Sequence, residues 1–165
     1  YSPAPIVDER MHKKIINEVM KPTMEGLIAE GSPYLGFLYA GLMISNGELK
    51  VLEFNCRFGD PETQPIMMRI KNDIVPIFEA CIDGTLATQT LQWKPESTVC
   101  VVMAAKGYPS SYEKGKEISG LNSDENRQVV VFHAGTKLEN GKVLTNGGRV
   151  LGVAGSTRTS AIFSQ

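Results

Sequence analysis

The first part of the chain shows helical spacing of its apolar residues. Between residues 8 and 30, apolar side chains recur at intervals of three and four positions, as on one face of an amphipathic helix. Asp8 is a suitable N-cap, and Gly31 is a suitable residue at which to end the helix. Pro22 lies inside the pattern, and proline cannot donate the backbone hydrogen bond of a helix interior. We therefore expect one helix that is kinked or split near Met20.

Two strand-like segments follow the helix. Residues 36–44 and 48–54 are rich in β-branched, aromatic and other apolar side chains, and Ser45-Asn46-Gly47 separates them. Asn-Gly between two such segments is a strong signal for a tight β-hairpin turn. The pattern predicts an antiparallel hairpin.

Two shorter helices are predicted after the hairpin. The first covers residues 65–70, and the second begins at Asn72 or Asp73 and ends at Gly84. The second has one apolar stripe formed by Ile74, Ile77, Phe78, Cys81 and Ile82.

The pattern changes to strands after residues 92–97. The predicted strands are residues 98–105, 129–134, 142–145 and 149–153, with turns at 107–109 and 140–141. We therefore predict an α+β protein with a first domain over residues 1–94 and a small β-rich domain over residues 95–165.

Composition limits the class of protein and of partner. The 165 residues include 17 Lys and Arg and 18 Asp and Glu, with a net charge of −1 and 42% apolar residues. No apolar run approaches the ~20 residues of a membrane span. No basic patch with interleaved aromatic residues suggests nucleic-acid binding. We expect a soluble globular protein with neither a membrane nor a nucleic acid as its partner.

The cysteines and the chain ends add two expectations. Cys56, Cys81 and Cys100 are far apart and odd in number, which favours reduced thiols in a cytoplasmic protein, each packed as a small core residue. The chain starts at Tyr1 without methionine, and a new helix is expected to begin within residues 158–163. We therefore expect a piece of a longer protein, with its last domain cut short.

The candidate chemistry begins on the second strand of the hairpin. Glu53, Asn55 and Arg57 occupy alternate positions, so an extended strand would place them on one face about 6.6 Å apart. The opposite face, with Phe54, Cys56 and Phe58, is expected to lie against the core. A carboxylate and an amide oxygen at this spacing can bind one hard cation, and an arginine suits phosphate. The alternatives are a strand face that is only solvated and, for Arg57, an ion pair with Asp60 or Glu62.

The turn after this strand adds more polar groups. Asp60 and Glu62 lie on either side of Pro61, which suits the first position of a helix. A helix N-terminus is a favourable place for anions and polar ligands. Asp60 is therefore a candidate site residue, or it is only the N-cap of the helix.

Five segments, in collinear order, carry a resemblance to a known family. They are GFLYAGLM at 36–43, LEFNCRFGDPETQP at 52–65, VVMAAKGYP at 101–109, VFHAGT at 131–136 and TNGGRV at 145–150. Together they resemble the glycinamide ribonucleotide synthetases, also called phosphoribosylamine–glycine ligases, of the ATP-grasp superfamily. The resemblance covers nearly the whole chain, and implies that residues 1–94 are the C-terminal portion of an ATP-grasp domain.

The resemblance implies an activity and its cofactors. Enzymes of this family join glycine to 5-phosphoribosylamine with ATP, through a glycyl phosphate intermediate, in de novo purine synthesis. By the family's pattern, Glu53 and Asn55 match ligands of magnesium or manganese that bridge the ATP phosphates. Arg57 is expected to steady the transferred phosphoryl group. Asp60 and Glu62 are expected to hold the ammonium of glycine or the amine and ribose of the co-substrate.

A second candidate site is the loop of Asn146, Gly147, Gly148 and Arg149. Two permissive glycines allow backbone amides to converge on an anion, and Arg149 adds charge. With the resemblance, we expect this loop to bind the phosphate of phosphoribosylamine. The alternative is a plain turn at the start of a strand with a surface arginine.

Two other interpretations remain beside the main one, and one further expectation concerns the chain alone. The glycine-rich lid and amino-terminal domain of the family have no counterpart in the chain, so the 165 residues alone are expected to be inactive without the rest of the parent protein. Another ATP-grasp carboxylate–amine ligase is the first alternative, although GDPETQP, VFHAGT and NGGRV argue against it. The second is a non-catalytic interaction module.

Overall fold

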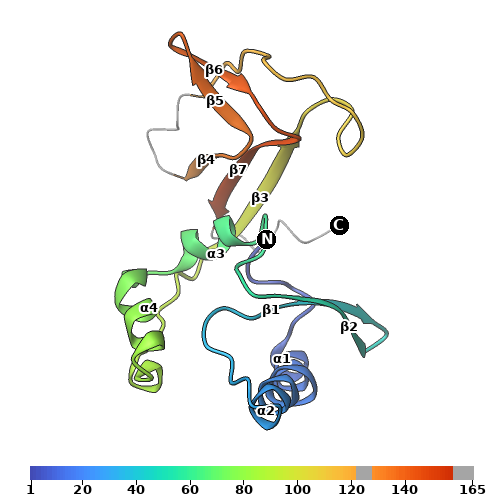
Figure 1. Cartoon of the computed structure of the whole chain (residues 1–165), viewed down its shortest axis with the longest axis vertical. Coiled ribbons are helices and arrows are strands. Elements are labelled where there is room, and N and C mark those ends of the chain that lie inside the picture. The colour runs from blue at the N-terminus through green and yellow to red at the C-terminus, as the bar shows by residue number, and fades with distance from the viewer. Residues whose placement is uncertain (122–127, 158–165) are drawn as a thin grey trace. The chain divides into compact units, whose positions relative to one another are not determined.

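The computed structural model describes residues 1–121 and 128–157 (Figure 1). The chain forms two compact units. The first, which we call the sheet unit, comprises Tyr1–Ser2, Asp60–Arg69 and Pro95–Gln165. The second, the hairpin unit, comprises Pro3–Gly59 and Ile70–Lys94. The domain boundary between residues 94 and 95 stays a prediction, and the helix expected within residues 158–163 lies outside the described residues.

The hairpin unit begins with a helical segment that is interrupted as predicted. Helix α1 (Glu9–Ile15) continues into a π-helical turn (Ile16–Met20) and then into α2 (Lys21–Ala29). The carboxylate of Asp8 accepts a hydrogen bond from the Met11 amide at 2.7 Å. The π turn lies directly before Pro22, where the regular helical hydrogen bond is missing. Gly31 follows the helix with φ of 74°, a conformation that glycine adopts readily.

The hairpin is confirmed, although its first strand is shorter than predicted. Strand β1 (Tyr39–Ser45) pairs with β2 (Glu48–Asn55) in antiparallel fashion. Asn46 and Gly47 have φ of 52° and 78°, as in a type I′ turn. Gly36 has φ of 129°, which is not a strand conformation, so the strand begins at Tyr39.

The two shorter helices are confirmed. Helix α3 (Thr63–Arg69) belongs to the sheet unit, and α4 (Ile74–Ile82) belongs to the hairpin unit. The N-cap of α4 is Asp73, whose carboxylate accepts from the Val75 amide, and a short 3-10 helix follows at Leu86–Thr88. Within the predicted apolar stripe, Ile82 is the last residue of α4 and is 73% exposed, whereas Ile77 is buried.

A three-stranded antiparallel sheet forms the centre of the sheet unit. The order is β3 (Ser97–Ala104), β7 (Arg149–Thr157) and β4 (Val129–His133), with β7 in the middle (Figure 1). Helix α3 packs against β3 and β7. The buried residues here include Pro65, Thr98, Val150, Leu151 and Ala154. The antiparallel strands and packed helices confirm the α+β class.

A second hairpin in the sheet unit contains a strand that the sequence pattern did not predict. Strand β5 (Thr136–Glu139) pairs with β6 (Lys142–Thr145). The turn at Asn140 and Gly141 is as predicted, with φ of 50° and 76°. The available signal for β5 was the Asn140-Gly141 turn, because a turn of this type usually joins two antiparallel strands and a strand was predicted only after it. None of the helices in the described residues is long and apolar enough to cross a membrane.

The cysteines follow the expectation only in part. All three are free. Cys81 and Cys100 are half-buried, whereas Cys56 is exposed. Since β2 ends at Asn55, Cys56 lies in a bend, and its expected place in the core is wrong.

Candidate functional site

The side chains of Glu53 and Asn55 lie together on one face of β2. The Asn55 amide nitrogen donates a hydrogen bond to Glu53 Oε1 at 3.1 Å. This contact confirms that alternate positions bring the two groups onto one face. With its nitrogen turned to Glu53, Asn55 keeps its amide oxygen available as an acceptor.

A glycine on the neighbouring strand makes room for Glu53. Gly41 is paired with Glu53 across the hairpin. A Cβ atom at Gly41 would lie 2.9 Å from Cγ of Glu53, which is closer than real Cβ contacts. Any larger residue at position 41 would therefore have to displace the Glu53 side chain. The sequence analysis did not single out Gly41, although a glycine inside a strand often marks such a close approach.

Arg57 does not continue this strand face. Strand β2 ends at Asn55, and the chain bends at residues 56–57. The Arg57 guanidinium donates from Nη1 to the Phe58 carbonyl at 2.8 Å. The expected row of three polar side chains is therefore reduced to two, because the extended backbone stops before the third.

The opposite face of β2 is only partly packed. Phe58 contacts Phe37, with ring centroids 4.0 Å apart. Phe54 is 42% exposed and Cys56 is exposed, so the expectation that this whole face lies against a core is wrong for both. The described sheet that contains β2 has only two strands, which leaves much of its surface uncovered.

The donor set of Glu53 and Asn55 fits a hard divalent cation. A carboxylate oxygen and an amide oxygen are ligands that magnesium and manganese accept. Among the described residues, no group of three or more His, Cys, Asp or Glu could hold a metal ion. The pair therefore suits a cation that completes its coordination with water and ligand phosphates rather than one enclosed by protein groups.

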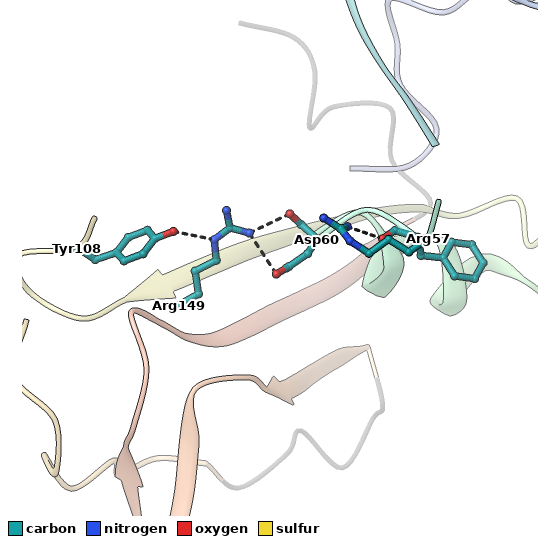
Figure 2. A network of polar contacts seen from close by, with 5 residues as sticks. Arg57, Asp60, Tyr108 and Arg149 are labelled. Atoms are coloured by element: carbon teal, nitrogen blue, oxygen red, sulfur yellow. Dashed lines mark hydrogen bonds and ion pairs between the residues drawn. The ribbon is translucent and has the colours of Figure 1, made fainter. Parts of the chain in front are cut away.

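Two of the predicted substrate residues, Asp60 and Arg149, meet in the sheet unit (Figure 2). Arg149 Nη1 lies 3.2 Å from the Asp60 carboxylate and donates to the Asp60 carbonyl at 3.0 Å. Arg149 Nε donates to the Tyr108 hydroxyl at 3.2 Å. Tyr108 is a member of this cluster that the sequence analysis treated only as part of a turn.

The electrostatics of the cluster keep Arg149 charged. The Tyr108 hydroxyl, first, and then the negative charge of Asp60 raise the pKa of Arg149. Arginine is already protonated at every pH at which proteins work. The cluster therefore presents a permanent cation whose side chain is 42% exposed.

Asp60 is not the N-cap of the following helix. Helix α3 begins at Thr63, and the Glu62 carbonyl accepts the bond from the Ile66 amide at 3.3 Å. Pro61 therefore lies before the helix and not at its first position. The Asp60 side chain is turned to Arg149 instead, because the backbone between residues 60 and 62 forms a turn.

The glycines of the second candidate loop allow close packing, and the anion binding expected of the loop stays a prediction. Gly147 and Gly148 have no positive φ, unlike the glycines of the tight turns. A Cβ at Gly147 would lie 2.8 Å from Gly135 Cα, and one at Gly148 would lie 2.2 Å from the Tyr108 ring. The Asn146 amide donates to the Gly135 carbonyl at 2.6 Å, so it is engaged within the fold. These glycines allow close packing, and Arg149 supplies the exposed charge.

A pocket of about 840 Å³ lies in the sheet unit beside this cluster. Gly107, which precedes Tyr108, and Tyr112 are among the residues that line it. The Tyr112 ring contacts the Tyr108 ring edge-on, with the ring centroids 6.2 Å apart. Lys106, Glu113 and Lys116 add charge to its wall. Lys116 pairs with Glu113 at 2.8 Å, which lowers the pKa of Glu113 and raises that of Lys116. The sequence analysis did not predict this pocket, because most of it is formed by irregular backbone.

Two family models match the chain. The model of phosphoribosylglycinamide synthetase, ATP-grasp (A) domain, matches residues 1–63. The model of phosphoribosylglycinamide synthetase, C domain, matches residues 98–162. The segment with Glu53, Asn55 and Asp60 lies in the first match, and Tyr108 and Arg149 lie in the second.

Curated proteins that are similar to the chain are named phosphoribosylamine–glycine ligase. The phosphoribosylamine–glycine ligases of Allochromatium vinosum and Vibrio cholerae are 57% and 54% identical to the chain, each over 152 residues. These alignments cover 92% of the chain, but only 36% and 35% of the relatives. The chain thus spans about a third of the length of the curated relatives it matches.

A solved structure is also similar. The crystal structure of the phosphoribosylamine–glycine ligase of Thermotoga maritima matches with a TM-score of 0.76 and 38% identity. The match covers 90% of the chain and 36% of that structure.

Proposed function

Because the chain belongs to the phosphoribosylglycinamide synthetase family, we propose that it forms part of a ligase that joins glycine to 5-phosphoribosylamine at the expense of ATP. In this reaction, a glycine carboxylate oxygen takes the terminal phosphoryl group of ATP, which gives glycyl phosphate and ADP. The amine of phosphoribosylamine then attacks the carbonyl carbon, and phosphate leaves. The products are glycinamide ribonucleotide, ADP and phosphate, and the step belongs to purine biosynthesis.

Glu53 and Asn55 would hold magnesium or manganese in this enzyme. Their side-chain oxygens lie on one face of β2, with the Asn55 nitrogen bonded to Glu53 Oε1. When bound, the cation would neutralise charge on the ATP phosphates. The extended backbone of β2 sets the spacing of the two side chains and so the position of the cation. Arg57, outside the strand, would contact the transferred phosphoryl group.

Asp60, Glu62 and Arg149 would bind the substrates that react with the nucleotide. The Asp60 carboxylate suits a cationic ammonium, and the exposed Arg149 guanidinium suits the phosphate of phosphoribosylamine. Asn146, Gly147 and Gly148, in the loop that leads to Arg149, would help to bind this phosphate. Most catalysis of this kind comes from positioning and from neutralising phosphate charge.

The observation that carries the proposal is the Glu53–Asn55 pair within the segment that matches the ATP-grasp domain. A solvated strand face needs no particular donor set, whereas nucleotide phosphates with a divalent cation need hard oxygen ligands. The close approach of Gly41 to Glu53 supports a side chain with a defined place.

The proposal is tested by ADP release from the complete protein that carries this chain. With ATP and Mg²⁺, we expect release only when both glycine and phosphoribosylamine are present. Bicarbonate and other small carboxylates in place of glycine should give no release. Equal rates with bicarbonate would assign the protein to another class of ATP-grasp ligase, and no ADP release with any substrate would refute the ligase function.

We further propose that the 165-residue chain alone is inactive. The residues that would hold adenine and cover the nucleotide in this family have no counterpart in its sequence. Glycine-dependent ADP release by the purified chain would contradict this. Location in the cytoplasm stays a prediction.

A further inference from the structure

We propose that Tyr108 is a positioning residue that directs Arg149 toward its anionic substrate, which the proposed function identifies as phosphoribosylamine. The inference rests on the proposed function for the identity of the substrate. It does not rest on that function for the geometry. No role beyond a turn is otherwise assigned to Tyr108.

Arg149 is held on one side by its neighbours. Its Nε donates to the Tyr108 hydroxyl, and its Nη1 donates to the carbonyl and contacts the carboxylate of Asp60. These contacts engage two of the three guanidinium nitrogens. Within the described part of the chain, no partner of Nη2 is recorded, so its two N–H groups remain for a ligand. An arginine fixed on one side and open on the other is suited to bind an oxyanion.

Tyr108 is itself held in place. A Cβ at Gly148 would lie 2.2 Å from Cδ2 of the Tyr108 ring, so the ring packs directly on the backbone beside Arg149. The ring also contacts Tyr112 edge-on. The Tyr108 amide donates to the Ala105 carbonyl at 3.0 Å. Tyr108 is therefore a fixed support for a side chain that is otherwise long and flexible.

Tyr108 and Arg149 together suit an anionic ligand. When the Tyr108 hydroxyl accepts from Arg149, its own hydrogen is left to donate. The free sides of Tyr108 and Arg149 then offer only hydrogen-bond donors, and the oxygens of a phosphate monoester can accept from them. The pocket of about 840 Å³ shares Gly107 and Tyr112 with the surroundings of Tyr108. Its volume lies in the range of pockets that hold small molecules, about 300–1,000 Å³.

The test is a double-mutant cycle on the complete protein. Calorimetry measures the Kd of ribose 5-phosphate, the probe for the sugar phosphate, for the unaltered protein, Tyr108→Phe, Arg149→Ala and the double variant. We expect Tyr108→Phe to weaken binding about tenfold when Arg149 is present, and less than about twofold when it is absent. Equal weakening in both backgrounds, no weakening in the first, or no binding by the unaltered protein would overturn the inference.

Two further measurements keep the result specific. Tyr34→Phe is the matched control, because it removes a tyrosine hydroxyl that donates to the Phe37 carbonyl in the hairpin unit, outside this cluster and its pocket; we expect unchanged affinity. Equal weakening by Tyr34→Phe would contradict a special role for Tyr108. ADP release is measured on the same samples. If the double-mutant cycle shows coupling between Tyr108 and Arg149 but the protein releases no ADP, the proposed function is refuted and the role of Tyr108 stays supported.

Discussion

The two groups of candidate site residues are held in different ways. Glu53 and Asn55 lie two positions apart on one strand, and the pairing of β1 with β2 sets their place. Arg149 is held by side-chain and backbone contacts with residues 41 and 89 positions away, Tyr108 and Asp60. In the first group, loss of one side chain leaves the backbone that places the other. In the second, loss of one member frees its neighbours.

The strand that carries Arg149 is also packed more tightly than the strand that carries Glu53 and Asn55. The sheet unit buries Val150, Leu151 and Ala154 on its central strand, which begins at Arg149. On β2, by contrast, Leu52 and Phe54 are 63% and 42% exposed. The comparison therefore predicts local effects in the hairpin unit and coupled effects in the sheet unit.

The largest effect is expected from Glu53→Gln. This change keeps the shape of the side chain and removes the charge that would bind a divalent cation. In the complete protein we expect kcat for ADP release to fall by about two orders of magnitude, with little change in stability. Steady-state assays over a range of Mg²⁺ concentrations measure this.

The control is Glu48→Gln, at the exposed first position of the same strand. It should leave kcat unchanged. A Glu53→Gln enzyme with more than half of normal kcat would break the distinction between the two ends of β2.

The next effect concerns packing in the sheet unit. A Cβ at Gly135 would lie 2.5 Å from Gly147 Cα and 2.6 Å from the Arg149 carbonyl, and backbone atoms cannot move aside cheaply. We expect Gly135→Ala to lower the free energy of unfolding by about 2–3 kcal/mol. Urea denaturation checks the value.

The matched control is Gly155→Ala, on β7, where the nearest atom would lie 3.8 Å away. It should change stability by less than about 1 kcal/mol. Equal losses for both variants would show that the close approach at Gly135 is not the cause.

A smaller effect is expected in cysteine reactivity. Burial, above all, raises the pKa of Cys100, so at pH 8 less of it is the reactive thiolate. Cys56 is exposed. We expect iodoacetamide to modify Cys100 about tenfold more slowly, with the gap narrowing as the pH rises through the raised pKa. Mass spectrometry of peptides follows both sites, and faster modification of Cys100 would contradict the comparison.

The smallest effect on stability is expected from Asp60→Asn. The ion pair with Arg149 is exposed, and such pairs contribute about 0–1 kcal/mol. Thermal unfolding should therefore change little. The KM for glycine or for phosphoribosylamine should rise several-fold in the complete protein. Unchanged KM values for both substrates and an unchanged kcat would remove Asp60 from the site.

Local features of the chain were predictable because neighbouring residues determine them. The cap at Asp8, the turn at Asn46 and the shared face of Glu53 and Asn55 all depend on residues within a few positions. The end of β2 before Arg57 was not predictable from alternation, since the pattern of side chains does not record where the backbone bends.

Contacts distant in sequence were not predictable from periodicity. Tyr108 joins Arg149 only because β3 and β7 are paired and Gly148 lets the ring approach. The family resemblance pointed to Arg149 and Asp60 as separate candidates, and the fold brings them into one ion pair. The close contacts of Gly147 with Gly135 and of Gly148 with Tyr108 likewise join residues that are distant in sequence.

We propose that the Glu53–Asn55 pair and the cluster of Asp60, Tyr108 and Arg149 serve different ligands. The most direct measurement compares Glu53→Gln and Arg149→Ala in the complete protein, with Mn²⁺–ATP binding followed by electron paramagnetic resonance and ribose 5-phosphate binding followed by calorimetry. We predict that Glu53→Gln weakens only Mn²⁺–ATP and that Arg149→Ala weakens only ribose 5-phosphate. Equal weakening of both ligands by either variant would contradict the claim.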